Sequence, residues 1–171
     1  MEERQRVMLI TGAAGGVGRA TVAYFAQAGW RVVGVDRADF GAGFPETGLF
    51  VRADISNPQD IETIYQQASA FAGVLDVVVN NAALQITRPL VETSVEEWDL
   101  VMASNLRSVF LGAKLAYPLL VAAGGGAIVN VSSVHAVATS ANIAAYAASK
   151  GGLLALTRAM AIEFAPDNIR A

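Results

Sequence analysis

The sequence contains no cysteine and only one histidine, His135. Without cysteine the chain can form neither a disulfide nor a thiolate nucleophile, and a cysteine-based zinc site is excluded. A single histidine also argues against a histidine-rich metal site. We therefore expect no resident metal and no thiol chemistry.

Charge is scarce as well. Charged residues make up 16% of the 171 residues, the net charge is −3, and no basic cluster is present. Nucleic acid and anionic membrane surfaces are therefore poor candidate partners. Residues 1–6 are rich in charge, unlike a signal peptide, and the longest apolar region, 109–123, is interrupted by Lys114 and Pro118. We expect a cytoplasmic protein without a membrane span.

Hydrophobic residues are abundant, at 54% of the chain, as expected for a parallel sheet that is covered on both faces. Short β-branched runs alternate with longer helical stretches. Strands are expected at 7–10, 31–36, 49–54, 74–80 and 127–132, and helices at 16–29, 57–72, 94–123 and 146–165. This alternation predicts βαβ units in a single α/β domain over residues 1–171.

The first expected strand ends in a glycine-rich run, 11-TGAAGGVG-18, which opens the first helix. Glycines allow a tight turn there and let the backbone approach a pyrophosphate, while the helix N-terminus supplies N–H groups and a positive dipole end. A glycine run alone is often only a turn, but the strand–turn–helix context favours a dinucleotide site. We predict cofactor contacts at Gly12, Gly16, Val17 and Gly18.

Asp36 ends the second expected strand, eighteen residues after Gly18. Its carboxylate can accept hydrogen bonds from a ribose diol and would repel a 2′-phosphate, which favours NAD over NADP. The neighbouring Arg37 argues the other way, because it could receive a 2′-phosphate. A solvated residue at a strand end is the alternative interpretation of Asp36.

Tyr146 and Lys150 are four residues apart, so they share one face of the expected last helix. An ammonium beside a phenol lowers the pKa of the phenol, which makes Tyr146 a candidate acid/base. Ser132 and Ser133 close the fifth expected strand, at the edge where ligands bind in open α/β sheets. Taken singly, these residues could equally be a half-buried aromatic, a surface lysine and a helix cap.

The order of these motifs resembles the short-chain dehydrogenase/reductase family, in its single-domain branch. The family's TGxxxGxG pattern is met by Thr11, Gly12, Gly16 and Gly18, its NNAG pattern appears as 80-NNAA-83, and its YxxxK pair matches Tyr146 and Lys150. The remaining matches are the adenine-side pair Asp54 and Ile55, the helix asparagine Asn105 and the serine Ser133.

The resemblance implies a Rossmann-type doubly wound parallel sheet of order 3-2-1-4-5. It implies that Tyr146 exchanges a proton with a carbonyl or alcohol oxygen, that Lys150 also holds the nicotinamide ribose, that Ser133 orients the substrate oxygen, and that Asn105 organises a relay water. Hydride would pass between a small-molecule secondary alcohol or ketone and NAD, without a metal. The further cofactor contacts that it implies are Asp36, Arg37, Asp54, Ile55, Asn80, Ala82, Tyr146 and Lys150.

Two departures from the family pattern affect these expectations. Ala83 replaces the last glycine of NNAG, which is tolerated if its φ is negative. Family members also continue beyond 167-DNIRA-171 through sixth and seventh strands and a substrate lid. We therefore expect those parts to be lacking, 127–132 to be an edge strand, and the 171-residue form to be weakly active or inactive. The alternatives are a non-catalytic dinucleotide-binding module and a fragment of a longer dehydrogenase.

Two helices, 96–123 and 146–165, carry apolar residues on more than one face. Deep burial is one explanation, and the resemblance implies another, because family members pair these helices across a two-fold axis. We expect a homodimer, with a tetramer possible. Gln85, His135 and Asn142 are candidates to line the substrate pocket, although a structural role is the alternative for His135.

Overall fold

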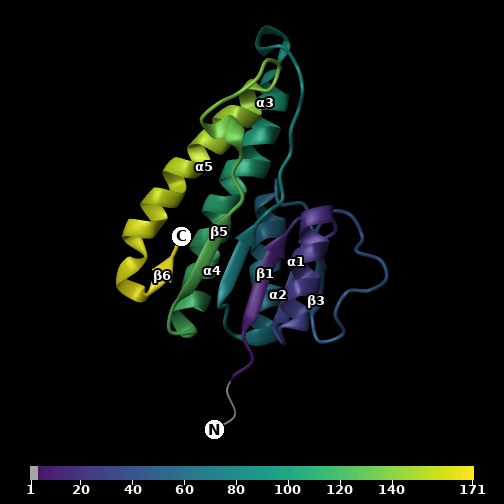
Figure 1. Ribbon diagram of the computed structural model, residues 1–171, viewed down its shortest axis with the longest axis vertical. Helices are drawn as coiled ribbons and strands as arrows, with labels where there is room; N and C mark the ends of the chain where they lie inside the picture. Colours follow the sequence, from purple (N-terminus) through teal and green to yellow (C-terminus); the bar gives the residue numbers. More distant parts are fainter. Residues whose placement is uncertain (1–3) are drawn as a thin grey trace.

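Residues 4–171, which the computed structural model describes, form a parallel six-stranded sheet with helices on both faces (Figure 1). The strand order is β3-β2-β1-β4-β5-β6, so the predicted Rossmann-type α/β fold and its 3-2-1-4-5 order are confirmed. The strands are β1 (Val7–Thr11), β2 (Arg31–Asp36), β3 (Leu49–Arg52), β4 (Val77–Asn80), β5 (Gly126–Asn130) and β6 (Ile169–Arg170).

The sixth strand corrects the expectation of a five-stranded sheet. After the last helix, Asn168 adopts a left-handed φ of +57°, which turns the chain back towards β5. The Gly126 N–H then donates to Asn168 O over 3.1 Å, and Ile169 and Arg170 pair with Gly126 and Ala127. Only the first two residues of β5 gain a partner in this way, so the rest of β5 still lies at the sheet edge.

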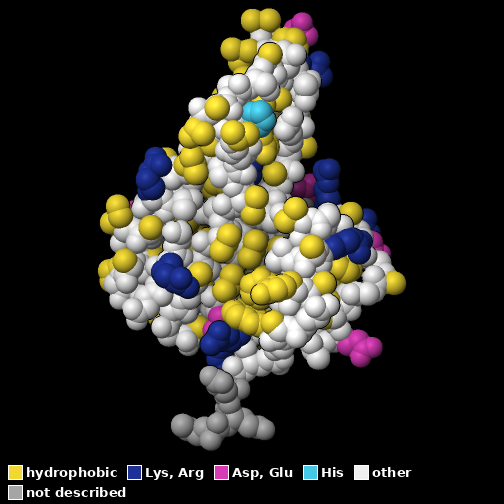
Figure 2. Space-filling view, viewed as in Figure 1, with side chains coloured by type: hydrophobic (Ala, Val, Ile, Leu, Met, Phe, Trp, Pro, Cys, Tyr) yellow, Lys and Arg dark blue, Asp and Glu magenta, His cyan; other side chains and the backbone are white. Residues whose placement is uncertain are grey.

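The helices divide unequally between the two faces. Helices α2 (Pro58–Ala72), α4 (Ser108–Ala122) and α5 (Ala144–Glu163) pack into the larger apolar core, while α1 (Gly16–Gln27) packs into a smaller one on the opposite face. Figure 2 shows hydrophobic side chains gathered near the middle of the α1 side. Val129 of β5 is 48% exposed, and it pairs in register with Val79, which belongs to the smaller core. The α1 face is therefore uncovered over β5.

The predicted single helix 94–123 is interrupted. It consists of α3 (Val95–Met102), a π-helical turn (Ala103–Arg107) and α4. Ser94 caps α3 in a reciprocal capping box with Glu97. The π turn contains Asn105, and a π-bulge inserts an extra residue that re-aims side chains within a helix. The sequence therefore predicted helix correctly on both sides of the π turn, but it did not predict the π turn itself.

None of the helices within residues 4–171 is both long enough and apolar enough to cross a bilayer. The expected cytoplasmic location stays a prediction.

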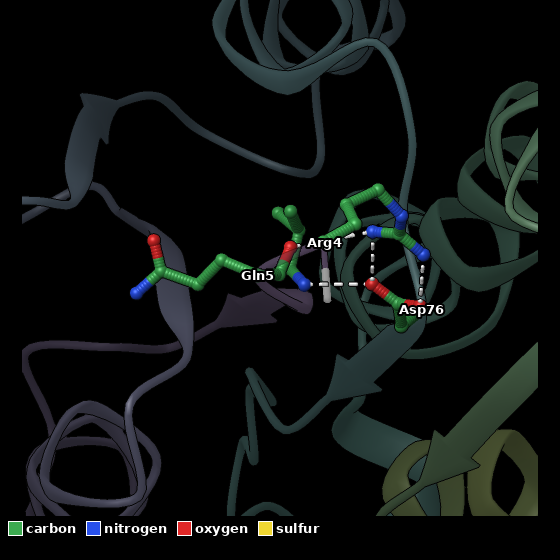
Figure 3. Close-up of polar contacts among 4 residues, drawn as sticks. Arg4, Gln5 and Asp76 are labelled. Atoms are coloured by element: carbon green, nitrogen blue, oxygen red, sulfur yellow. Dashed lines mark hydrogen bonds and ion pairs between the residues drawn. The ribbon is translucent and has the colours of Figure 1, made fainter. Parts of the chain in front are cut away.

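An ion pair fastens the end of the sheet that lies away from the glycine turn (Figure 3). Arg4 donates from both of its terminal nitrogens to the Asp76 carboxylate, at 2.9 and 2.6 Å, and the Val7 N–H donates to the same carboxylate at 2.7 Å. Partial burial acts to raise the pKa of Asp76, but these hydrogen bonds and the charges of Arg4 and Arg6 outweigh it and lower the pKa. Asp76 thus joins the start of β1 to the start of β4.

We predict that Asp76→Asn lowers the free energy of unfolding by about 1 kcal/mol or more at neutral pH, because it removes the charge that Arg4 faces. Since the folded pKa of Asp76 is lowered, its contribution is complete above the ordinary carboxyl pKa and is lost as the pH falls through the folded value. Urea unfolding between about pH 7 and about pH 2 measures this difference. The control is Glu62→Gln on the exposed face of α2. A difference that persists undiminished at the lowest pH would contradict the prediction.

Candidate active site

A cavity of about 390 Å³ lies at the carboxyl edge of the sheet, around the glycine turn and the ends of β2, β3 and β4. Nine of the predicted cofactor contacts line it: Gly12, Gly16, Val17, Gly18, Asp36, Arg37, Asp54, Ile55 and Ala82. The lining also includes residues that the sequence analysis did not name as cofactor contacts: Gly15, Val35, Ala53, Asn81, Ala83, Leu84 and Ser104. Most of these directly adjoin predicted contacts, so adjacency was the signal that could have found them.

The glycine turn is held by close backbone packing. Gly12 has a φ of +69°, and Gly18 sits so near the turn that an added Cβ would stand 2.0 Å from Gly12 O. The Asn81 amide donates to Thr11 O and Gly12 O at 3.1 and 3.2 Å, which ties the turn to the residues after β4. Gly16 differs from Gly18, because no atom beyond its chain neighbours and its own helix backbone lies within 4 Å of its Cβ position. The turn therefore needs glycine at 12 and 18 for packing and leaves open space at 16.

Asp36 ends β2, which lies on the opposite side of β1 from β4. Its Oδ2 accepts from the Ala14 N–H and its Oδ1 from the Ala38 N–H, both at 2.9 Å. A carboxylate has room for about four hydrogen bonds, so both oxygens can accept further donors from the cavity. Arg19 is bonded to the backbone oxygens of Ala14 and Phe40. Asp36 is therefore a preorganised acceptor beside the cavity.

Tyr146 and Lys150 project from the first turns of α5, as predicted. Lys150 is 2% exposed, its Nζ donates to Val131 O at 2.6 Å, and the same nitrogen lies 5.7 Å from the centre of the Tyr146 ring. Burial lowers the pKa of Lys150. The ammonium is thus fixed at the end of β5 and close to the phenol, although neither residue lines the cavity described above.

Ser133 and His135 lie near Tyr146, in the segment that follows β5. Ser133 begins the short 3-10 helix η3 (Val134–Ala136), and its Oγ accepts from the His135 N–H at 3.2 Å. The His135 ring meets the Tyr146 ring edge-on, with 6.1 Å between centroids. Both serines lie just beyond β5, which ends at Asn130 rather than at 132. The structure therefore brings Ser133, Tyr146 and Lys150 into one neighbourhood, with His135 beside them.

Asn105 is almost completely buried, at 1% exposure. Its Oδ1 accepts from the Leu84 N–H at 2.7 Å, and its Nδ2 donates to Leu84 O at 2.8 Å and to Ser149 Oγ at 3.0 Å. The side chain is therefore engaged with the backbone that follows β4 and with α5. Sequence reasoning did not single out Ser149, because a serine inside a helix carries no signal without its partner.

The structure does not bring every predicted residue to the cavity. Asn80 is buried and donates to Asn130 Oδ1 at 2.8 Å instead. Asn142 is exposed in a left-handed conformation, and its carbonyl accepts from the Arg88 N–H. Gln85 is exposed. Ala83 is not among the non-glycine residues with positive φ, so the methyl group in place of the family glycine is accommodated. No cluster of three or more metal-ligating side chains occurs within residues 4–171.

Comparison with known proteins agrees with this geometry. A family model described as short chain dehydrogenase matches residues 6–171. An uncharacterized oxidoreductase of Schizosaccharomyces pombe is 37% identical over 166 residues, covering 96% of this chain and 64% of that protein. A cis-4-hydroxycyclohexanecarboxylate dehydrogenase of Sinomonas cyclohexanicum is 38% identical, covering 97% of this chain and 70% of that protein.

Among solved structures, a 3-ketoacyl-(acyl-carrier-protein) reductase from Brucella melitensis in complex with NADH superposes with a TM-score of 0.91 at 35% identity. That match covers 97% of this chain and 72% of the reductase. The chain therefore spans between 64% and 72% of the length of these three relatives.

We predict that Gly18→Ala lowers the free energy of unfolding by about 1–3 kcal/mol, because the new methyl group collides with backbone atoms of Gly12 and Ala13. Gly16→Ala is the matched control within the same turn, and its change should stay within about 0.5 kcal/mol. Denaturant unfolding of the two variants measures both values. Equal losses for the two substitutions would contradict the packing that the structure shows.

Proposed function

The chain belongs to the short-chain dehydrogenase family, and on that premise we propose that it transfers hydride between NAD and a secondary alcohol or ketone. One observation carries the proposal: Ser133, Tyr146 and a buried Lys150 gather on the carboxyl side of a sheet whose glycine turn frames a cavity. Ligands of open α/β sheets bind at this edge. Dehydrogenation, the reaction in the family's name, is chemistry that these three side chains can support.

The cavity residues fit a dinucleotide. The first turn of α1 leaves backbone N–H groups without helical acceptors, and Gly16 leaves open space beside them. These groups would hold the pyrophosphate, and Asp36 would accept from the adenosine ribose. A 2′-phosphate would meet the Asp36 carboxylate, so we propose NAD rather than NADP, with Arg37 as the residue that could soften the preference. The NADH held by the Brucella melitensis reductase is consistent with this assignment.

The bound nicotinamide supplies hydride transfer, and the residues of this chain manage the proton and the position of the substrate. Tyr146 gives a proton to the substrate oxygen in reduction and takes it in oxidation. The Lys150 ammonium, held against Val131 O, stabilises the phenolate form of Tyr146 by its charge. Within residues 4–171, Ser133 Oγ accepts one hydrogen bond, from the His135 N–H, and its own hydrogen remains available to orient the substrate oxygen.

For the 171-residue chain alone we propose weak turnover. The lining of the cavity includes none of Ser133, Tyr146 and Lys150, and Val134 and Val137 beside them are 65% and 82% exposed. Water therefore reaches the substrate side, whereas catalysis of this kind benefits from its exclusion. The same openness favours a second candidate function, a dinucleotide-binding module without catalysis.

We predict that the wild-type chain binds NAD more tightly than NADP and oxidises secondary alcohols slowly. Tyr146→Phe should abolish this oxidation and leave NAD affinity within about twofold, because the lost hydroxyl lies outside the cavity. Calorimetry and NADH absorbance over an alcohol panel measure the two properties. NAD binding with no turnover on any substrate would select the non-catalytic module, and turnover at ordinary enzyme rates would contradict the expected weakness.

We also propose that two copies pair through α4 and α5. The two helices form a groove of about 450 Å³, lined by Phe110, Ala113, Lys114, Tyr117, Leu156, Ala159, Met160, Glu163 and Phe164. Phe110 is 51% exposed, and Ile162 on α5 is 77% exposed. Such apolar side chains in adjacent helices are a surface that a second copy would cover.

We therefore expect light scattering to give the mass of a dimer or a larger assembly. Phe110→Glu should reduce this mass to that of the monomer, because it puts a charge into the apolar groove. Val91→Glu is the control, since Val91 is 93% exposed and lies outside the groove. A monomeric wild type would contradict the pairing.

A further inference from the structure

Ser149 is a buried hydroxyl to which the proposed mechanism gives no role. It is fully buried on α5, between Tyr146 and Lys150 in the sequence. Its Oγ donates to Tyr146 O at 2.7 Å and accepts from Asn105 Nδ2 at 3.0 Å. A helical serine that bonds back to its own helix normally satisfies only itself. Here the same oxygen also receives a bond from a different element, so it connects two parts of the fold.

The connection continues to the wall of the cavity. Asn105 bonds to both the N–H and the carbonyl of Leu84, in the way that a neighbouring strand would. Leu84 itself lines the cavity. A chain of hydrogen bonds therefore runs from the cavity wall through Asn105 and Ser149 to the backbone of Tyr146, and every bond in it is between 2.7 and 3.0 Å.

The first turn of α5 has few other restraints on this side. Its N-cap residue, Ile143, makes no side-chain capping bond. Within residues 4–171, the tethers from Lys150 Nζ to Val131 O and from Ser132 Oγ to Lys150 O lead to the segment that follows β5, and the Arg88 N–H donates to Asn142 O just before the helix. Ser149 thus connects the first turns of α5 to the cavity wall, through Asn105, and not to the segment after β5.

We propose that Ser149 is a positioning residue that, through Asn105, fixes the first turn of α5 and so sets the place of the Tyr146 hydroxyl relative to the cavity. The proposal rests on the proposed function in taking Tyr146 as the acid/base. It also gives the Asn105 side chain a holding role, since its amide is already engaged by Leu84 and Ser149. Small displacements of a reacting group reduce rates strongly, which makes such a tether consequential.

The same helix offers a matched control. Thr157 lies eight residues further along α5, and its Oγ1 donates to Leu153 O at 2.7 Å while accepting from Asn130 Nδ2 at 2.9 Å. It therefore makes the same pair of bonds as Ser149, to its own helix and to an asparagine, but about two turns away from Tyr146. Thr157→Val and Ser149→Ala each remove one hydroxyl from an equivalent arrangement.

The experiment follows the ¹³C chemical shift of the Tyr146 ring at neutral pH by NMR of the ¹³C-tyrosine-labelled chain, with Tyr146→Phe identifying its signal. The signal reports the position of the ring, because Lys150 Nζ and the His135 ring centroid lie 5.7 and 6.1 Å from the Tyr146 ring centroid. Within residues 4–171, no hydrogen bond reaches the Tyr146 hydroxyl from α3 or from the π turn. We expect Ser149→Ala to shift this signal and Thr157→Val to leave it unchanged.

Activity and binding supply the second readout. Ser149→Ala should reduce kcat by roughly tenfold or more, while the Kd for NAD stays within about twofold, because Ser149 lies outside the cavity. Thr157→Val should change neither value. Equal effects of the two variants, or an unmoved Tyr146 signal in Ser149→Ala, would overturn the proposal. Failure of the proposed function would appear separately, as a wild type that binds no NAD, and the comparison of the Tyr146 signals would still decide the role of Ser149.

Discussion

The parallel pairing of β1 with β4 is the contact on which the cavity depends. It brings Thr11 opposite Asn80, although these residues are far apart in the sequence. Side chains fasten both ends of the pair: Asp76 binds Arg4 and the Val7 N–H at one end, and Asn81 binds Thr11 O and Gly12 O at the other. The other features of the site are built onto this edge of the sheet. A slip of one residue between β1 and β4 would turn the side chains of one strand to the opposite face and so disrupt the site.

Asparagine side chains provide hydrogen bonds where the strands end and the sheet no longer provides them. Like a peptide group, an amide side chain carries both a donor and an acceptor, so it can satisfy backbone that has lost its neighbour. Asn81 does this for the glycine turn and Asn105 for Leu84, while Asn80 and Asn130 bond to each other between β4 and β5. The site therefore rests on polar side chains with fixed partners, which resist small displacements better than apolar contacts do.

Much of this arrangement could be predicted from sequence, because it depends on local patterns. The strand periods, the glycine turn and the neighbourhood of Tyr146 and Lys150 follow from residues that lie close together along the chain. The errors concern features that only tertiary contacts create. The two-residue β6 is too short to show a period, the π turn exists where Asn105 meets Leu84, and Asn80 points to Asn130 instead of the cavity. Ser149 acquires meaning only from Asn105, which is 44 residues away.

The burial of Lys150 has a chemical consequence of its own. The lysines of this chain are Lys114, which is exposed on α4, and Lys150, which is 2% exposed with its amine bonded to Val131 O. In an unpaired subunit, an acylating reagent that attacks free amines would therefore modify Lys114 readily and reach Lys150 only when α5 separates from the end of β5. The ratio of the two acylation rates would therefore report how often α5 separates from the end of β5, which is a measure of local opening at this site.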